Sequence, residues 1–180
     1  MAQGLLLIDI QNDYFAGGAM ELVAMERAAD KAASVLKRCR SKGCAVFHVQ
    51  HLAARPEAGF FIPDTPGAEI NTRVQPAAGE SVTQKHFPNA FRDTDLEQAL
   101  RSSGIDELVI VGAMSHMCID ATTRAAFDLG FTCTVLEDAC ATRDLTFNDK
   151  PVSASDVHAS FMAALGGIYA TVTTADSACS

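Results

Sequence analysis

The chain has 180 residues, of which 48% are hydrophobic and 20% are charged, and its formal net charge is −8. This length suits one core, so we expect a single domain over residues 1–180. The acidic balance and the lack of any Lys/Arg run argue against nucleic-acid partners and anionic membrane surfaces. No apolar run reaches the roughly 18 residues of a membrane helix. No signal peptide is visible, so we expect a cytoplasmic protein.

The cysteines include no C-x-x-C pair and mostly lie in apolar segments, which is typical of reduced thiols in the cytosol. They are Cys39, Cys44, Cys118, Cys133, Cys140 and Cys179. We expect five of them to act as small hydrophobic residues. Cys118 is the exception, because it follows a buried strand and a tight turn at the start of a helix. A helix N-terminus lowers the pKa of a thiol, so Cys118 is expected to be a reactive thiolate.

Residues 5–10 form a short continuous apolar run, which favours a strand covered on both faces. Asp9 interrupts the run near its carboxyl end, where acids of α/β proteins face the ligand crevice; a cap for the next loop is the alternative. Residues 21–42 have apolar side chains at helical spacing and end at Gly43, and residues 44–50 form a second strand. This order predicts a right-handed parallel crossover.

Residues 51–79 are repeatedly interrupted by Pro and Gly, so we expect a long loop, and such loops are often functional. The apolar segment Phe60-Phe61-Ile62 within it must bury against a partner subunit, the core or a substrate, and all three alternatives stay open.

The rest of the chain continues the alternation of strands and helices. The expected strands are residues 80–84, 107–112, 133–137 and 168–173, and the expected helices are residues 94–104, 117–129 and 153–166. Thr94 and Glu97 match a capping box, which places a helix start at Thr94, and residues 138–150 are expected to form a polar loop. Six strands and four helices predict an α/β fold of three layers, a Rossmann-like arrangement whose six-stranded, mostly parallel sheet has helices on both faces.

Three reactive residues follow strands of this expected sheet: Asp9, Lys85 and Cys118. Ligands bind beyond the carboxyl ends of parallel strands, so we expect the three side chains to meet there, from neighbouring strands. A carboxylate, an ammonium and a thiol can together perform nucleophilic acyl transfer. Asp9 would take the thiol proton and return it to the leaving group, while Lys85 would orient the pair and stabilise the thiolate.

The N–H groups of Met114 and Cys118 are the expected oxyanion hole, at the turn before the helix. Substrate-binding residues are expected in the loops at the same edge. The candidates are Gln11, Phe15, Phe60, Phe61, Phe87, Phe91 and His116, with Asn89 and Arg55 as further polar contacts. For each phenylalanine, the core or a subunit interface is an open alternative. Asp13 is interpreted as a loop brace, and a Cys118–His116 dyad is a further alternative to the lysine arrangement.

The chain lacks the signatures of dinucleotide, P-loop and serine-hydrolase sites. Three segments do resemble a known family. They are residues 7–13, Lys85 with Ala90 and Phe91, and residues 112–119 with Thr122 and Ala126 behind them. In this order and spacing they are similar to the isochorismatase-like cysteine hydrolase superfamily, which includes nicotinamidases, N-carbamoylsarcosine amidases and isochorismatases.

The resemblance implies a triad of Asp9, Lys85 and Cys118, a cis peptide bond at Ala113–Met114, and homodimers or homotetramers. It implies cysteine-dependent hydrolysis of a small-molecule amide, ureide or carbamoyl compound through a covalent thioester, without a cofactor. A vinyl-ether hydrolase of the isochorismatase type is an alternative, although isochorismatases lack the nucleophilic cysteine. The other alternative is a binding protein that has the same fold but no catalytic activity.

Nicotinamidases of this family bind a metal through an Asp-x-His motif and further His residues after the second strand. Here His51 matches one ligand, but no Asp precedes it and no His follows before His86. Zinc sites need three or four protein ligands, so we expect no metal. His48 is interpreted as a strand residue with a hydrogen-bonded ring, and His51 as a hydrogen-bond donor in a pocket or loop.

Overall fold

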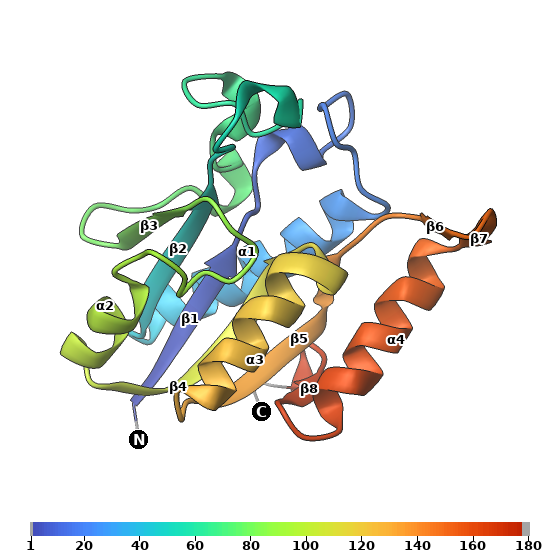
Figure 1. Cartoon of the computed structure of the whole chain (residues 1–180). Coiled ribbons are helices and arrows are strands. Elements are labelled where there is room, and N and C mark those ends of the chain that lie inside the picture. Colours follow the sequence, from blue (N-terminus) through green and yellow to red (C-terminus); the bar gives the residue numbers. More distant parts are fainter. Residues whose placement is uncertain (1, 178–180) are drawn as a thin grey trace.

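The computed structural model describes residues 2–177 and shows one open sheet between two layers of helices (Figure 1). The six strands run in the order β3-β2-β1-β4-β5-β8, and every neighbouring pair is parallel. They are β1 Ala2–Ile8, β2 Ala45–His51, β3 Ser81–Lys85, β4 Ile105–Ala113, β5 Thr132–Ala141 and β8 Thr171–Thr173. The α-helices are α1 Met25–Ser41, α2 Leu96–Ser102, α3 Asp120–Asp128 and α4 Ala154–Gly166. The three-layer α/β fold expected from the sequence is confirmed.

Strand β1 is apolar on both faces because each face meets a helix layer. Leu5 and Leu7 pack in the core cluster under α1, and Leu6 and Ile8 pack in the cluster that includes α2, α3 and α4. Figure 1 shows α1 behind the sheet, with α3 and α4 in front of it. None of the helices within residues 2–177 is long and apolar enough to cross a membrane.

Two expected helix starts are wrong. Helix α1 begins at Met25, not near residue 21, because Ala24 has a left-handed backbone with φ 58° that cannot continue a helix. The capping box at Thr94 does not form. Helix α2 begins at Leu96, while the Thr94 hydroxyl donates to the carbonyl of Ala90 at 2.6 Å and so holds the preceding loop.

The expected polar loop at residues 138–150 is also wrong. Strand β5 continues to Ala141 after an irregularity in its pairing with β4, and residues 145–152 form an antiparallel hairpin of β6 (Leu145–Phe147) and β7 (Lys150–Val152). This hairpin projects beside the N-terminal end of α4 (Figure 1). Ser153 opens α4 as expected, because its hydroxyl accepts from the N–H of Asp156 at 3.1 Å.

The carboxyl ends of β1 and β4 lie side by side at the centre of the sheet, where the order of connections reverses and ligand crevices form. Gly112 of β4 pairs with Ile8 of β1 and has φ 130°. A Cβ at residue 112 would lie 1.9 Å from the Ile8 carbonyl oxygen. Because residue 112 is a glycine, β1 and β4 can remain paired as far as Ile8 and Gly112.

Candidate active site

Asp9, Lys85 and Cys118 meet at the carboxyl edge of the sheet, as the sequence predicts. The Nζ of Lys85 lies 2.8 Å from Oδ2 of Asp9 and 3.1 Å from Sγ of Cys118. The relative exposures are 0% for Asp9, 0% for Lys85 and 3% for Cys118. Buried charges of opposite sign interact more strongly than exposed ones, so this ion pair holds the thiol in a fixed, water-poor position.

Local backbone geometry presents two of these side chains. Asp9 follows β1 with φ 53°, a left-handed conformation that is uncommon for a residue other than glycine and is often found at functional sites. Its N–H donates to the carbonyl of Val49 at 3.0 Å, which fixes the turn. Cys118 lies in a π-helical turn, Ser115–Ile119, that leads from β4 into α3. Such turns occur frequently at functional sites.

Lys85 does not come from a strand next to β1, contrary to expectation. Strand β2 lies between β1 and β3, and its last residue, His51, pairs in register with Lys85. The His51 Nδ1 lies 2.8 Å from the Lys85 Nζ and 3.9 Å from Oδ2 of Asp9. His51 is therefore a central member of the site, although its ring was expected only to donate from a pocket or loop.

The protonation of His51 follows from its neighbour. A lysine ammonium can only donate, so Nδ1 of His51 accepts and Nε2 carries the ring proton. Burial and the positive charge of Lys85 lower the pKa of His51 to about 4. The ring is therefore a neutral group with its Nε2–H available to a bound molecule.

The thiol of Cys118 is protonated at rest, and the expected low-pKa thiolate is wrong. Burial and then the negative charge of Asp9 raise the pKa of Cys118, and they outweigh the lowering effect of Lys85. Burial alone lowers the pKa of Lys85, but its contacts with the Asp9 carboxylate and the Cys118 sulfur reverse this and raise it. A nucleophilic attack by this thiol would therefore need a base.

Asp9 is placed to be that base. Its Oδ1 is buried without a hydrogen-bond partner among residues 2–177. Donor atoms of Asp9, His51 and Cys118 lie within 4.8 Å of one another. Such a set could suggest a metal, but the Lys85 ammonium already bonds to all three side chains at 2.8–3.1 Å. A second cation there would be strongly repelled, so these residues do not fit a metal site.

The turn after β4 has the backbone geometry that the family resemblance implies. The Ala113–Met114 peptide bond is cis. The Met114 carbonyl accepts from the N–H groups of Met117 at 3.0 Å and Ile119 at 3.2 Å, which ties it to the start of the π turn. Residues 114–118, which we call the oxyanion turn, thus lie directly beside the thiol. The use of the Met114 and Cys118 N–H groups as oxyanion donors stays a prediction.

A cavity of about 430 Å³ opens beside His51, and we call it the His51 cavity. It is lined by His51, Ala53, Ala54, Arg55, Glu57, Ala58, Phe60, Phe61 and His86. Phe61 is buried, and its ring centre lies 4.6 Å from that of Tyr14. The Asp13 carboxylate accepts from the Phe61 N–H at 2.6 Å, so Asp13 is a loop brace as expected. The two phenylalanines therefore belong to both the core and the cavity wall.

Several other predicted contact residues do not line the His51 cavity. Gln11 is a structural brace, because its amide donates to the carbonyls of His51 and Ala68 and accepts from the His51 N–H, all at 2.8 Å. Phe15 is buried under the guanidinium of Arg73. Both side chains thus have partners within the protein, and their use as substrate contacts stays a prediction.

The remaining aromatic candidates also have protein partners. Phe91 stacks on Phe131 in the core beside α3, with ring centres 6.1 Å apart. His116 bonds through Nδ1 to the Thr142 hydroxyl at 2.6 Å, which argues against a dyad with Cys118. For Phe87, the backbone carbonyl accepts from Lys85 at 3.1 Å, so this residue holds the ammonium through its main chain.

Outside the site, His48 has a bonded ring as expected, with Nε2 at 2.9 Å from the Glu80 carboxylate. The cysteines within residues 2–177 are free thiols, again as expected. They are Cys39, Cys44, Cys118, Cys133 and Cys140. Cys179 lies outside the described residues.

Comparison with known proteins agrees with this geometry. The family model described as "Isochorismatase domain" matches residues 3–177. The isochorismatase family protein YddQ of Bacillus subtilis, whose function is uncharacterized, is 52% identical over 176 residues, covering 98% of each chain. A streptothricin hydrolase of Streptomyces noursei is 36% identical over 143 residues, which is 79% of this chain and 51% of that protein.

Solved structures share the whole fold. An isochorismatase from Pseudomonas putida KT2440 is 36% identical, with a TM-score of 0.92 over 97% of this chain and 89% of that one. An N-carbamoylsarcosine amidase from Thermoplasma acidophilum is 26% identical, with a TM-score of 0.82 over 98% of each chain. With the family model spanning nearly the whole chain, this protein belongs to the isochorismatase family of hydrolases.

Proposed function

We propose that this protein is a cysteine hydrolase that cleaves a C–N bond of a small amide, ureide or carbamoyl compound. The observation that carries the proposal is the buried contact of one ammonium, on Lys85, with both the Asp9 carboxylate and the Cys118 thiol. A nucleophile, a base and a cation thus converge on one point, which is what covalent acyl transfer requires.

In the first half-reaction, Asp9 takes the proton of the Cys118 thiol as Sγ forms a bond to the substrate carbonyl carbon. The carbonyl oxygen becomes an oxyanion, which the N–H groups of Met114 and Cys118 stabilise. The C–N bond then breaks, Asp9 gives its proton to the departing nitrogen, and the acyl group remains on Sγ as a thioester.

In the second half-reaction, a water molecule attacks the thioester carbon and Asp9 takes one of its protons. The C–S bond breaks, Asp9 gives the proton from water to the sulfur, and the carboxylic or carbamic acid leaves. Lys85 stays protonated throughout, because its charge balances Asp9 at rest and the negative charge that moves onto the sulfur.

The size and lining of the His51 cavity favour a small substrate that is partly apolar. Its volume of about 430 Å³ lies within the range of small-molecule sites. Phe60 and Phe61 supply apolar walls, and the Nε2–H of His51 offers one donor near the thiol. The relatives named streptothricin hydrolase and N-carbamoylsarcosine amidase fit a reaction at a C–N bond.

An amide-hydrolysis screen tests the proposal. Purified protein is incubated with a panel of primary amides, ureides and carbamoyl compounds, with ammonia release as the readout and Cys118→Ala as the matched control. We expect release with at least one compound by the wild-type chain alone, and a mass increase on the peptide containing Cys118 when the reaction is quenched early. Full turnover by Cys118→Ala would contradict the proposal, as would cleavage of isochorismate with no amide cleaved.

A further inference from the structure

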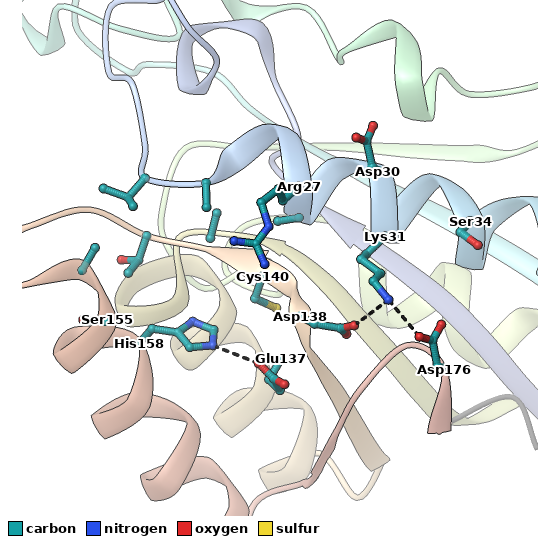
Figure 2. Close-up of a pocket in the computed structure, with 16 residues that line it drawn as sticks. Arg27, Asp30, Lys31, Ser34, Glu137, Asp138, Cys140, Ser155, His158 and Asp176 are labelled. Atoms are coloured by element: carbon teal, nitrogen blue, oxygen red, sulfur yellow. Dashed lines mark hydrogen bonds and ion pairs between the residues drawn. The ribbon is translucent and has the colours of Figure 1, made fainter.

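A second, larger cavity lies between α1, β5 and α4 (Figure 2). Its volume is about 770 Å³, and we call it the α1–α4 cavity. Ala141 and Thr142 at the end of β5 line it, and both bond to the oxyanion turn: Ala141 to Ser115 and Thr142 to His116. Hydrogen bonds thus join the wall of the α1–α4 cavity to the oxyanion turn.

His158 of α4 makes the other link. Its Nδ1 lies 2.8 Å from the Ser115 hydroxyl, and its Nε2 lies 3.5 Å from the Glu137 carboxylate. Figure 2 shows the His158 ring at the cavity edge, directed toward Glu137. Ser115 itself is fully buried and also bonds to the Ala141 carbonyl at 3.2 Å. The Ser115-His158-Glu137 chain resembles a nucleophile, base and acid, but the buried hydroxyl cannot reach a substrate.

The direction of the hydrogen bonds around Ser115 depends on which ring nitrogens of His158 carry a proton. The Ser115 hydroxyl has one proton and two neighbouring acceptors, the Ala141 carbonyl and the His158 Nδ1. If the imidazole is neutral with its proton on Nε2 toward Glu137, the hydroxyl donates to Nδ1 and releases Ala141. If the imidazole is protonated, Nδ1–H donates to the hydroxyl, which then donates to Ala141. Only the protonated ring satisfies all three contacts at once.

We propose that His158, at the edge of the α1–α4 cavity, is a positioning residue of the active site, which sets the geometry of the oxyanion turn through its bond to Ser115. Ser115 follows Met114 directly and precedes Cys118 by three residues, so a shift of its hydroxyl moves the backbone next to both oxyanion donors. The proposal rests on the thioester mechanism above and adds a residue that never touches the substrate.

Charged groups from several elements share this cavity with His158. Arg27 and Lys31 come from α1, Glu137 and Asp138 from β5, and Asp176 from the segment after β8. Lys31 is engaged with Asp138 at 3.3 Å and with Asp176 at 2.9 Å, which leaves Glu137 as the carboxylate bonded to His158.

Two chemical probes separate positioning from general damage. p-Nitrophenyl acetate acylates a thiol through a tetrahedral oxyanion, whereas iodoacetamide alkylates it at carbon without one. We expect His158→Leu and Ser115→Ala each to slow acylation of Cys118 by p-nitrophenyl acetate roughly 3- to 10-fold, the range for one neutral hydrogen bond. The rate of alkylation by iodoacetamide should stay within about two-fold of the wild-type rate, because this reaction forms no oxyanion for the turn to stabilise.

A double variant, a conservative variant and a control variant complete the test. The double variant should be no slower than either single one, since both remove the same interaction. His158→Asn, whose side-chain amide can still bond to the Ser115 hydroxyl, should keep most of the acylation rate. Ser34→Ala, which lines the same cavity away from Ser115, is the control and should match the wild-type chain.

The outcomes distinguish this inference from the proposed function. A wild-type chain with no acetyl group on Cys118 would overturn the thioester mechanism and this inference with it. Acylation of His158→Leu at the wild-type rate, equal slowing with both probes, or additive effects in the double variant would overturn the role of His158 alone.

Discussion

The ammonium of Lys85 donates to Nδ1 of His51 across two paired strand ends, at 2.8 Å. This one bond fixes the tautomer of the ring, so that Nε2 carries the proton, and His51 also lines the His51 cavity. The histidine that could have suggested a metal site instead accepts a hydrogen bond from the buried ammonium of Lys85.

Substitution of His51 should affect substrate binding more than the chemical step. In His51→Asn the side-chain oxygen can still accept from Lys85, but the donor into the cavity is lost. We expect KM to rise roughly 10-fold, which corresponds to about 1.4 kcal/mol, with kcat nearly unchanged. Steady-state kinetics on a substrate found in the screen measures both, and His51→Leu, which loses both contacts, should lower kcat as well. An unchanged KM in His51→Asn would contradict this role.

Removal of the charge on Asp9 should make the Cys118 thiol more reactive toward an alkylating agent and yet abolish hydrolysis. Asp9 raises the pKa of Cys118, so Asp9→Asn should lower that pKa and speed alkylation by iodoacetamide between about pH 7 and pH 9. Hydrolysis should nevertheless be lost, because the base is gone. Alkylation followed by mass spectrometry against pH gives the first result, and ammonia release gives the second. Slower alkylation in Asp9→Asn would show that the carboxylate activates the resting thiol instead.

The brace at Asp13 should control the loop that carries Phe60 and Phe61. Its carboxylate accepts from the N–H groups of Phe61 and Ala19 at 2.6 Å and 3.2 Å. Asp13→Ala leaves these donors without a partner, so we expect a loss of roughly 1–3 kcal/mol in the free energy of unfolding. Urea denaturation measures this, and Asp13→Asn should recover part of it. Unchanged stability in Asp13→Ala would mean that water replaces the carboxylate.

Acid stability should depend on Glu80, which bonds to Arg40 and His48. The hydrogen bonds from Arg40 lower the pKa of Glu80 from 4.5 to about 2. A carboxyl whose pKa is lower in the folded state stabilises the fold above its unfolded pKa, and this stabilisation is lost as pH falls through the folded value. Glu80→Gln should therefore reduce Tm at pH 7, and the difference from the wild-type chain should shrink between about pH 4.5 and pH 2. A constant difference in Tm across this range would contradict the assignment.

The assembly expected from the family resemblance is a homodimer or homotetramer. Several large apolar side chains are well exposed in the single chain, including Val23 at 53% and Phe147 at 72%. Such residues favour burial in an interface. Sedimentation equilibrium should give a mass of two or four chains of 19.1 kDa, and a monomer at micromolar concentration would contradict the expectation.

The fold class and the three reactive residues could be predicted from the sequence because both depend on local patterns. Continuous apolar runs mark strands buried on both faces, and the carboxyl ends of parallel strands share one edge. Asp9 and Cys118 follow such runs and Lys85 ends a short strand, so their convergence needed no knowledge of the strand order.

The tertiary structure alone decided what surrounds them. The position of β2 between β1 and β3 places His51 against Lys85. The packing of α4 brings His158 into contact with Ser115, although the two residues are 43 positions apart in the sequence. The state of the thiol was also beyond the sequence, since burial and the nearness of Asp9 outweigh the helix start that suggested a thiolate. Strand order, burial and charge distance are properties of the packed chain, and no local pattern of residues specifies them.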